Sequence, residues 1–366
     1  MKSEIKLLKE YQEYRMNGKG DDPKTVEKKL HAIHMFRKFI NKPFHKFNKD
    51  DATEFKNYLV YTRKLGLRTV YSYLYYLEQF FYWLSCEKGY RSKIVRNHIE
   101  FFSLNRSEKA IVNSSSPILF PDIDYILKFH NSIPVDTEIG MRDRALVAIA
   151  YCSGMRAETL TTLKLGSIDE NYFVYQDPEK DVKTKFSKKN VTLIFDYHPS
   201  LKKSIEEWIR FLKKKGFVET DPLFPKFAPL AGTNQNFLFE DYNEPSKEFI
   251  SNPNTLNQIF RRRCKIAGIE YKHPHLFRHA FFDTGREYCT NSKQFKALSQ
   301  SGSHSNIETT MKIYGELTIE ELKKQLLKIN ANIINSKKSN PEDDEFIKML
   351  DELKEKVKSR KRKKRF

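Results

Sequence analysis

The chain has 366 residues, of which 39% are hydrophobic, 13% aromatic and 31% charged, so it is neither a minimal scaffold nor a disordered polymer. No apolar run approaches the ~20 residues of a membrane-spanning helix, and the first residues lack the apolar stretch of a signal peptide, so we expect a cytoplasmic, nucleoid-associated protein. Lys plus Arg exceed Asp plus Glu by 66 to 47, a formal charge of +19 that favours nucleic acid as the partner.

The first 105 residues are expected to form a helical bundle. Helical spacing of apolar residues predicts helices over 23–42 and 68–89, with a third between them for which Asp50 or Asp51 is the candidate N-cap and Gly66 the candidate stop. The helix over 68–89 carries an apolar stripe typical of a bundle, formed by Val70, Leu74, Leu77, Phe81 and Leu84. Residues 106–118 gather Ser, Asn and Pro and are predicted to be a linker.

A second domain is expected over 119–335, mostly helical with a small antiparallel sheet. Aromatic and β-branched residues flank a lysine-rich centre over 171–196, which predicts a hairpin. Helices are expected at 120–132, within 141–169, and near 199–215, 253–267, 275–288, 292–299 and 307–331, with an irregular insert over 217–246. The charged tail, 336–366, ends in a basic run typical of a phosphate-seeking arm. The fold class expected is mainly α, with a mixed α+β second domain.

Three histidines and an arginine crowd the stretch HPHLFRHAFF at 273–282. A helix beginning near His275 places Arg278 one turn away and His279 beside them, and a helix start favours anions. Zinc would need further ligands at matched spacing, and the four cysteines form no CxxC pair. We therefore expect oxyanion binding and no metal or cofactor.

Other candidate site residues are suggested by their order along the chain. Arg156 follows a break at Ser153 and Gly154 and begins a new helix, so its guanidinium is expected near an exposed turn. A lysine of DVKTKF lies in the predicted hairpin, and His304 precedes Tyr314 by ten residues in SGSHSNIETTMKIYGE.

This order resembles the tyrosine recombinase (phage integrase) family, which includes archaeal and bacterial integrases and Xer-type recombinases. The family's marks are an arginine in a G-[LM]-R-x-x-E-L helix, a hairpin lysine, an H-x-L-R-H box and a G-H-S-S-I-x-T-T-x-x-Y segment. The resemblance covers about 120–318 by motif, and the N-terminal bundle is similar to the family's core-binding domain. Thr159 stands where the family has a glutamate, with Glu158 one place early, so we expect the contact of that glutamate to be rearranged. The VKT pattern favours Lys183 as the hairpin lysine, while Lys185 lies at an almost equally good distance from the following strand.

The resemblance implies site-specific cleavage and rejoining of double-stranded DNA through a 3'-phosphotyrosyl intermediate, without metal or ATP. The implied catalytic residues are Arg156, Lys183, His275, Arg278, His304 and Tyr314. Two guanidiniums suit a phosphate clamp, a tyrosine supplies the nucleophile, and a lysine can protonate the leaving oxygen. A homotetramer on DNA is also implied, held by exchange of C-terminal helices. The amphipathic segment 318–334 can dock on a partner or pack on its own domain.

Two other interpretations remain open at the level of sequence. A type IB topoisomerase shares the nucleophile and the clamp, and would relax supercoils as a monomer without a specific site. A DNA-binding relative that has lost cleavage would act as an architectural factor. Neither the recombination site, nor the direction of the reaction, nor delivery of Tyr314 within one subunit or to its neighbour follows from the sequence.

Overall fold

The structure, a computed structural model, describes residues 3–114, 119–184, 188–229, 242–250, 252–302 and 317–338. The chain divides into two compact units, Met1–Ile118 and Leu119–Phe366, each with its own hydrophobic core. Helices dominate both, and the strands in the described ranges form two small antiparallel sheets in the second unit. The expected fold class, mainly α with a mixed α+β second unit, is confirmed.

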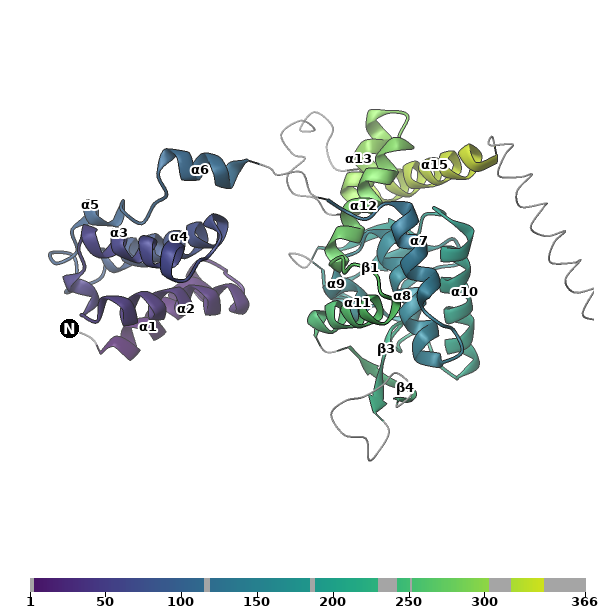
Figure 1. The fold of residues 1–366 in the computed structure, drawn as a ribbon, viewed down its shortest axis with the longest axis horizontal. Helices are drawn as coiled ribbons and strands as arrows, with labels where there is room; N and C mark the ends of the chain where they lie inside the picture. Colours follow the sequence, from purple (N-terminus) through teal and green to yellow (C-terminus); the bar gives the residue numbers. More distant parts are fainter. Residues whose placement is uncertain are drawn as a thin grey trace, which may run out of the picture. The chain divides into compact units, whose positions relative to one another are not determined.

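The N-terminal unit is a bundle of helices (Figure 1). In chain order these are α1 (Glu4–Glu13), α2 (Pro23–Ile40), α3 (Lys49–Asn57), α4 (Leu67–Leu84), α5 (Arg96–Ile99) and α6 (Arg106–Asn113), with π-helical turns at Tyr14–Gly18 and Tyr58–Thr62 and a 3-10 turn at Phe44–Lys46. The apolar stripe predicted for the helix over 68–89 is fully buried along α4. Edge-on contacts of Phe36 with Phe55 and Phe81 fill the centre of the bundle, where aromatic pairs prefer this geometry.

Two helix boundaries in this unit differ from the prediction. Asn48, rather than Asp50 or Asp51, caps α3: its side chain accepts a hydrogen bond from the Asp51 N–H at 3.0 Å, and the Asp51 carboxylate accepts one from the Asn48 N–H at 2.7 Å. This reciprocal capping box satisfies two N–H groups at once. Gly66 does not end a helix but precedes α4 as its N-cap.

The stretch expected to be a linker contains helix α6. Asn105 caps α6 through a second capping box with Glu108. Two contacts hold α6 on the bundle: Lys56 pairs with Glu108 at 3.2 Å, and the Arg68 guanidinium donates to the Val112 carbonyl at 3.1 Å. The prediction of irregular chain over 106–118 was therefore wrong for 106–113, because α6 is short and polar and its capping signal lies in a Ser- and Asn-rich stretch.

The second unit is built around helix α8 (Glu138–Ser153), which is buried along most of its length. The other helices in the described part of this unit are α7 (Ile123–Ser132), α9 (Ala157–Thr162), α10 (Pro199–Lys214), α11 (Pro253–Ala267), α12 (Pro274–Glu287), α13 (Ser292–Ser301) and α15 (Ile319–Lys338), with 3-10 turns at Leu165–Ser167 and Pro178–Lys180. α8 packs against both α10 and α12, so it links the core to the helix that carries HPHLFRHAFF. No helix within the described ranges is long and apolar enough to cross a membrane.

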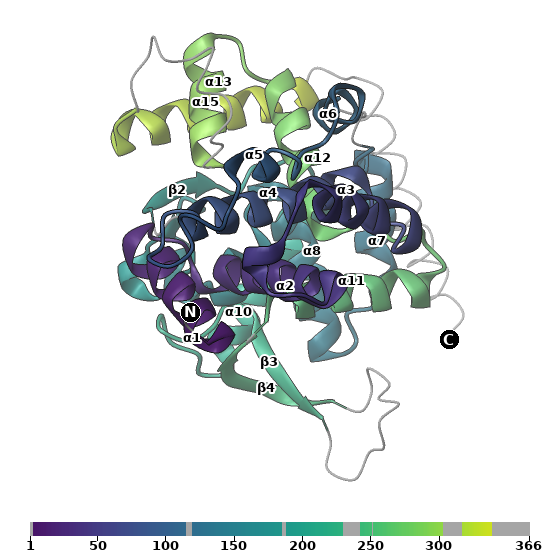
Figure 2. The same ribbon diagram turned by 90° about the vertical axis from the view of Figure 1, so that its left-hand side faces the viewer.

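Each sheet of this unit is a pair of antiparallel strands. β1 (Phe173–Gln176) pairs with β2 (Asn190–Leu193), which confirms the predicted hairpin. β3 (Pro225–Pro229) pairs with β4 (Tyr242–Phe249) with register shifts, so the insert expected to be irregular contains a strand pair. These strands were not predicted because prolines interrupt the alternation of apolar and polar residues that marks a strand. Prolines are nevertheless tolerated at strand ends and bulges. Figures 1 and 2 show β3 and β4 extending beyond the helices at one end of the unit, opposite α13 and α15.

Helix α15 packs on its own unit. Its apolar side chains Leu322, Leu326, Ile329 and Ile333 are buried in the core of that unit, and the helix contacts α13 and β2. Of the two placements that the sequence left open for 318–334, the structure shows this one.

Candidate active site

Arg156 lies at a sharp junction between two helices. α8 ends at Gly154, whose φ of 58° is left-handed, and a Cβ there would lie 2.3 Å from the Phe281 ring. Glycine is therefore required both for the turn and for the close approach of α12. Arg156 follows as the N-cap of α9, as the break at Ser153 and Gly154 predicted. The turn before it was expected to be exposed, but it is buried against Phe281 of α12, with Ser153 only 2% exposed, and Arg156 itself is half-buried.

Helix α12 presents the histidine and arginine pair of HPHLFRHAFF. The His273 side chain caps the helix by accepting from the His275 N–H at 3.1 Å, and Pro274 occupies the first turn, where a missing N–H costs nothing. Phe277 and Phe281 are fully buried and anchor one side of α12 in the core. The helix was predicted to begin near His275 and begins at Pro274.

Arg278 joins three segments that are distant in the sequence. Its side chain is only 4% exposed, and its guanidinium donates to the carbonyl oxygens of Gly154, at the end of α8, and of Gly302, at the end of α13. Its Cζ lies 4.9 Å from the centre of the Phe282 ring, in a cation–π contact. Gly302 is needed here too, because a Cβ would lie 2.0 Å from the Phe282 ring.

The two arginines form a cationic pair. Burial, together with repulsion from Arg156, lowers the pKa of Arg278 to about 9, and burial lowers the pKa of Arg156 as well. Both groups remain protonated at neutral pH. Because two neighbouring cations in a desolvated place repel each other, an anion that accepts hydrogen bonds from both would relieve that repulsion. The arrangement is thus suited to a phosphate.

His275 lies one helical turn from Arg278. Partial desolvation, followed by repulsion from four neighbouring His and Arg side chains, lowers the pKa of His275 to about 4. Desolvation and Arg278 also lower the pKa of His279, whose ring centre lies 4.9 Å from that of His275. Both imidazoles are therefore neutral at pH 7, and a neutral imidazole can accept a proton.

The hairpin lysine is tied by its backbone to the helix that Arg156 caps. The Lys183 N–H donates to Thr162 Oγ1 at 2.9 Å, and the Lys183 carbonyl accepts from Thr159 Oγ1 at 2.9 Å. The Lys183 side chain is exposed. Thr159, which stands where the family has a glutamate, thus makes a direct contact with the hairpin.

Among the predicted site residues, the structure brings together Arg156, His275 and Arg278, and ties Lys183 to α9. His304, Tyr314 and Lys185 lie outside the described residues, as do the basic run of the tail and positions 307–316 of the helix predicted near 307–331. The described part of that helix begins at Ile319, as α15, and the two residues before it, 317–318, are not helical. The sequence did not single out Thr159 and Thr162 as anchors of Lys183, or Phe282 as the support of Arg278. Phe282 carries one signal that could have found it, since it follows Arg278 by four residues on one helix face.

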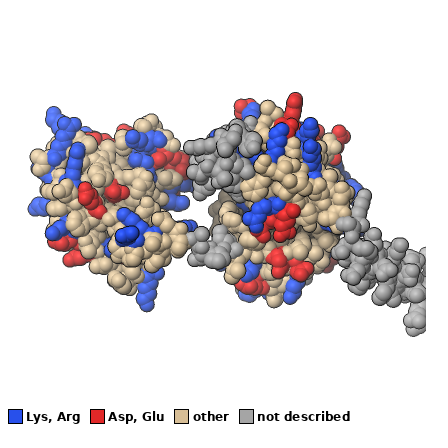
Figure 3. All heavy atoms as spheres, turned by 90° about the horizontal axis from the view of Figure 1, so that it is seen from above, with Lys and Arg blue, Asp and Glu red and all other residues tan. Residues whose placement is uncertain are grey.

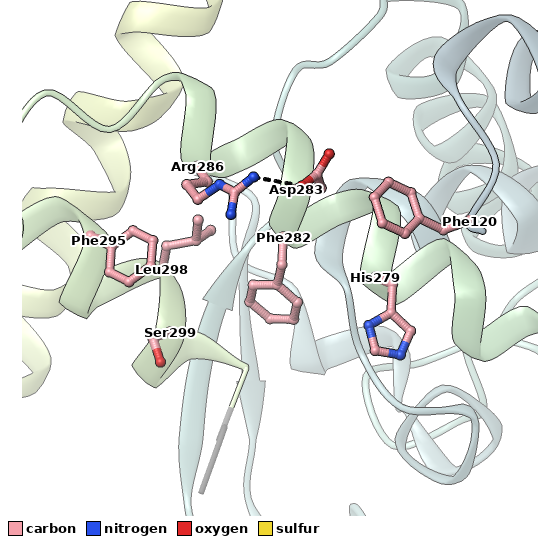
Figure 4. A pocket seen from close by; sticks show the side chains of 8 residues that line it. All are labelled: Phe120, His279, Phe282, Asp283, Arg286, Phe295, Leu298 and Ser299. Carbon is pink, nitrogen blue, oxygen red and sulfur yellow. Dashed lines mark hydrogen bonds and ion pairs between the residues drawn. The ribbon is translucent and has the colours of Figure 1, made fainter. Parts of the chain in front are cut away.

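A pocket of about 210 Å³ lies beside this cluster (Figure 4). His279, Phe282, Asp283 and Arg286 line it from α12, Phe295, Leu298 and Ser299 line it from α13, and Phe120 closes it from the segment before α7. Arg286 pairs with Asp283 at 2.9 Å across its rim. Phe282 therefore serves two places, because its ring lines this pocket and also contacts the guanidinium of Arg278.

Surface charge is mixed on the face drawn in Figure 3, where Lys and Arg are interspersed with Asp and Glu on both units. Within the described ranges no group of three or more His, Cys, Asp or Glu side chains is placed to hold a metal ion. The positive charge of the site comes from two arginines, the half-buried Arg156 and the buried Arg278.

Known proteins resemble this chain over both units. The Phage integrase family profile matches residues 120–321, and the profile for the phage integrase N-terminal SAM-like domain matches residues 7–89. Tyrosine recombinase XerC of Bacillus pumilus is 23% identical over 88% of this chain and 96% of its own length. Tyrosine recombinase XerC of Staphylococcus haemolyticus is 24% identical over 54% of this chain, a match that spans 56% of that relative.

Solved structures share the fold. The lambda integrase tetramer bound to a Holliday junction aligns over 82% of this chain and 78% of that chain, with a TM-score of 0.55 at 14% identity. Since the integrase profile alone covers more than half of the sequence, and the arginines, the hairpin lysine and the H-x-x-R-H helix lie within it, the chain belongs to the phage integrase family.

Proposed function

We propose that the protein is a site-specific DNA recombinase that cleaves and rejoins strands through a 3'-phosphotyrosyl intermediate, without metal or ATP. The observation that carries the proposal is the convergence of Arg156 and Arg278 at one place, with the neutral His275 beside them. Membership of the phage integrase family and similarity to tyrosine recombinases XerC support it.

The clamp acts on the phosphate. Each guanidinium can donate two parallel hydrogen bonds to nonbridging oxygens, whose negative charge grows as the phosphorus becomes pentavalent. Arg278 is preorganised for this task, because its fixed contacts with Gly154 and Gly302 leave little freedom to be lost on binding. Arg156 approaches from the start of α9.

The remaining groups move protons and form the covalent bond. Tyr314 attacks the phosphorus, a phenolate being favoured beside two arginines, and His275 accepts or returns its proton. His304 adds a hydrogen bond to the phosphate, and Lys183 protonates the departing 5'-oxygen. Since the phosphotyrosyl bond conserves the energy of the broken bond, a 5'-hydroxyl from a second strand can reverse the step and exchange strands.

The partner of this site is double-stranded DNA, which suits the charge of +19. Exchange between two duplexes requires four active sites, so we place the chain in a homotetramer on DNA, as in the lambda integrase tetramer on a Holliday junction. Action on chromosomal or mobile-element DNA places the protein in the cytoplasm, at the nucleoid.

The test is covalent capture. Full-length protein is incubated with a pool of nicked duplexes of randomised sequence, in which the short cleaved fragment diffuses away and the adduct accumulates. Protein-linked DNA is recovered under denaturing conditions and sequenced to define a substrate. Wild type and Tyr288→Phe, a control tyrosine of the same unit, should form the adduct, whereas Tyr314→Phe should form none while still binding DNA. An adduct that survives in Tyr314→Phe removes this residue from its role, and no adduct from any protein supports a non-catalytic relative.

A further inference from the structure

Two threonines of α9 hold the backbone of Lys183 from both sides. We propose that Thr159 and Thr162 are positioning residues, which fix the general acid Lys183 in register with Arg156. This inference rests on the proposed function, since it assigns the leaving-group proton to Lys183. Neither threonine is proposed to contact the reacting atoms, so each acts through the lysine.

The geometry couples the lysine to the arginine through one rigid element. Thr159 and Thr162 are three residues apart, on the same face of α9, and Arg156 precedes Thr159 by three residues as the N-cap of that helix. Thr159 Oγ1 donates to the Lys183 carbonyl at 2.9 Å, and Thr162 Oγ1 accepts from the Lys183 N–H at 2.9 Å. One donor and one acceptor thus fix the position and direction of the Lys183 peptide groups.

The hairpin needs this support. The β1–β2 register ends at Gln176 and Asn190, so Lys183 lies in the long connection between two four-residue strands. An isolated pair of strands is marginally stable and sets no fixed position for its connection. Val182, only 1% exposed, and Thr184, which donates to the Lys188 carbonyl at 2.8 Å, secure the residues on either side. The backbone is therefore held while the Lys183 side chain is left exposed to reach the DNA.

The chemistry of the leaving group gives these two threonine contacts a measurable consequence. As Tyr314 Oη bonds to phosphorus, the P–O5' bond breaks with its electron pair on the oxygen, and Lys183 Nζ–H supplies the proton that completes the 5'-hydroxyl. A misplaced lysine slows only this proton transfer. When sulfur replaces the bridging 5'-oxygen, the leaving group is a thiolate, which departs without a proton because thiols are far more acidic than alcohols. A variant that misplaces Lys183 should then cleave this substrate at close to the wild-type rate.

The experiment compares single-turnover cleavage of the duplex recovered above with either 5'-oxygen or 5'-sulfur at the cleaved bond. The variants are Thr159→Val and Thr162→Val, which remove one hydroxyl each at nearly constant volume, and Thr159→Ser, which retains the donor. Thr161→Val is the matched control, because Thr161 is a buried threonine of the same helix whose hydroxyl donates to the Glu158 carbonyl at 3.0 Å. Circular dichroism at the assay temperature reports whether each variant is folded.

We expect Thr159→Val and Thr162→Val to cleave the 5'-oxygen substrate roughly 10- to 100-fold more slowly than wild type, and the 5'-sulfur substrate within about 3-fold of it. Thr159→Ser and Thr161→Val should match wild type on both. Equal losses on the two substrates, or no loss on either, would overturn the positioning role. If Thr159→Val is unfolded, Thr162→Val alone decides by the same criteria. Failure of this inference leaves the Tyr314→Phe result untouched, so the two proposals fail separately.

Discussion

Replacement of Arg278 by lysine tests whether this side chain serves both the fold and the reaction. The guanidinium donates to two carbonyls, of Gly154 and of Gly302, from a position that is 4% exposed. A lysine ammonium can reach one of these oxygens but not both, and it loses the planar contact with Phe282. One hydrogen bond from a charged group is lost and one buried carbonyl is left unpaired, which costs about 2 kcal/mol of unfolding free energy.

Activity should fall further than stability. A point charge cannot make two parallel hydrogen bonds to the phosphate, and loss of a single oxyanion donor costs about 2.7–4 kcal/mol in the transition state, or 10²- to 10³-fold in rate. Arg156→Lys makes the same chemical change at a half-buried helix start. We therefore expect a similar loss of rate from Arg156→Lys but less than about 1 kcal/mol of stability.

Urea unfolding followed by circular dichroism gives the stability of both variants, and single-turnover adduct formation gives the rates at a temperature where both are folded. These roles of the two arginines are excluded if Arg278→Lys unfolds at the same urea concentration as wild type, or if either variant cleaves at the wild-type rate.

Two further predictions concern buried polar groups in the second unit. Desolvation lowers the pKa of His130 from 6.5 to about 4, so this histidine contributes stability that is fully present above pH 6.5 and is lost as the pH falls towards 4, about 3 kcal/mol in all. The unfolding free energy should therefore fall less between pH 7 and pH 4.5 in His130→Gln than in wild type. An equal fall in both proteins would show that His130 is not the source of this pH dependence. The Asp143 carboxylate, fully buried, accepts from Arg142 at 2.6 Å and from Arg263 at 2.7 Å. Asp143→Asn should lower the unfolding free energy by about 3–5 kcal/mol in urea titrations. Asp283→Asn, which removes the carboxylate from a solvent-exposed pair with Arg286, should lower it by less than about 1 kcal/mol. Similar small losses in both variants would exclude a buried ion network.

The sequence predicted those parts of the fold that depend on periodicity and local turn chemistry. The stripe from Val70 to Leu84 marked the buried face of α4, because a helix repeats every 3.6 residues whatever surrounds it. The break at Gly154 placed Arg156 at a helix start, and a left-handed glycine does end α8 there. Both features are encoded within a few residues of each other.

The parts that the sequence did not reveal depend on distant partners. Thr159 and Thr162 are ordinary helix residues until the fold brings Lys183 against them, and a hydrogen bond between residues some twenty positions apart leaves no periodic trace. The strand pair β3–β4 was missed because its prolines interrupt the alternation that marks a strand. The contacts of Arg278 with Gly154 and Gly302 likewise follow only from the packing of α12 between α8 and α13.

The role of Tyr314 as the nucleophile is tested by identifying the amino acid that carries the DNA. The trapped adduct is digested with protease and nuclease, and the modified peptide is sequenced by mass spectrometry. We expect a nucleotide joined through its 3'-phosphate to the Tyr314 side chain, with a free 5'-hydroxyl on the released fragment. A 5'-phosphate linkage, or attachment to any other residue, would exclude Tyr314 as the nucleophile.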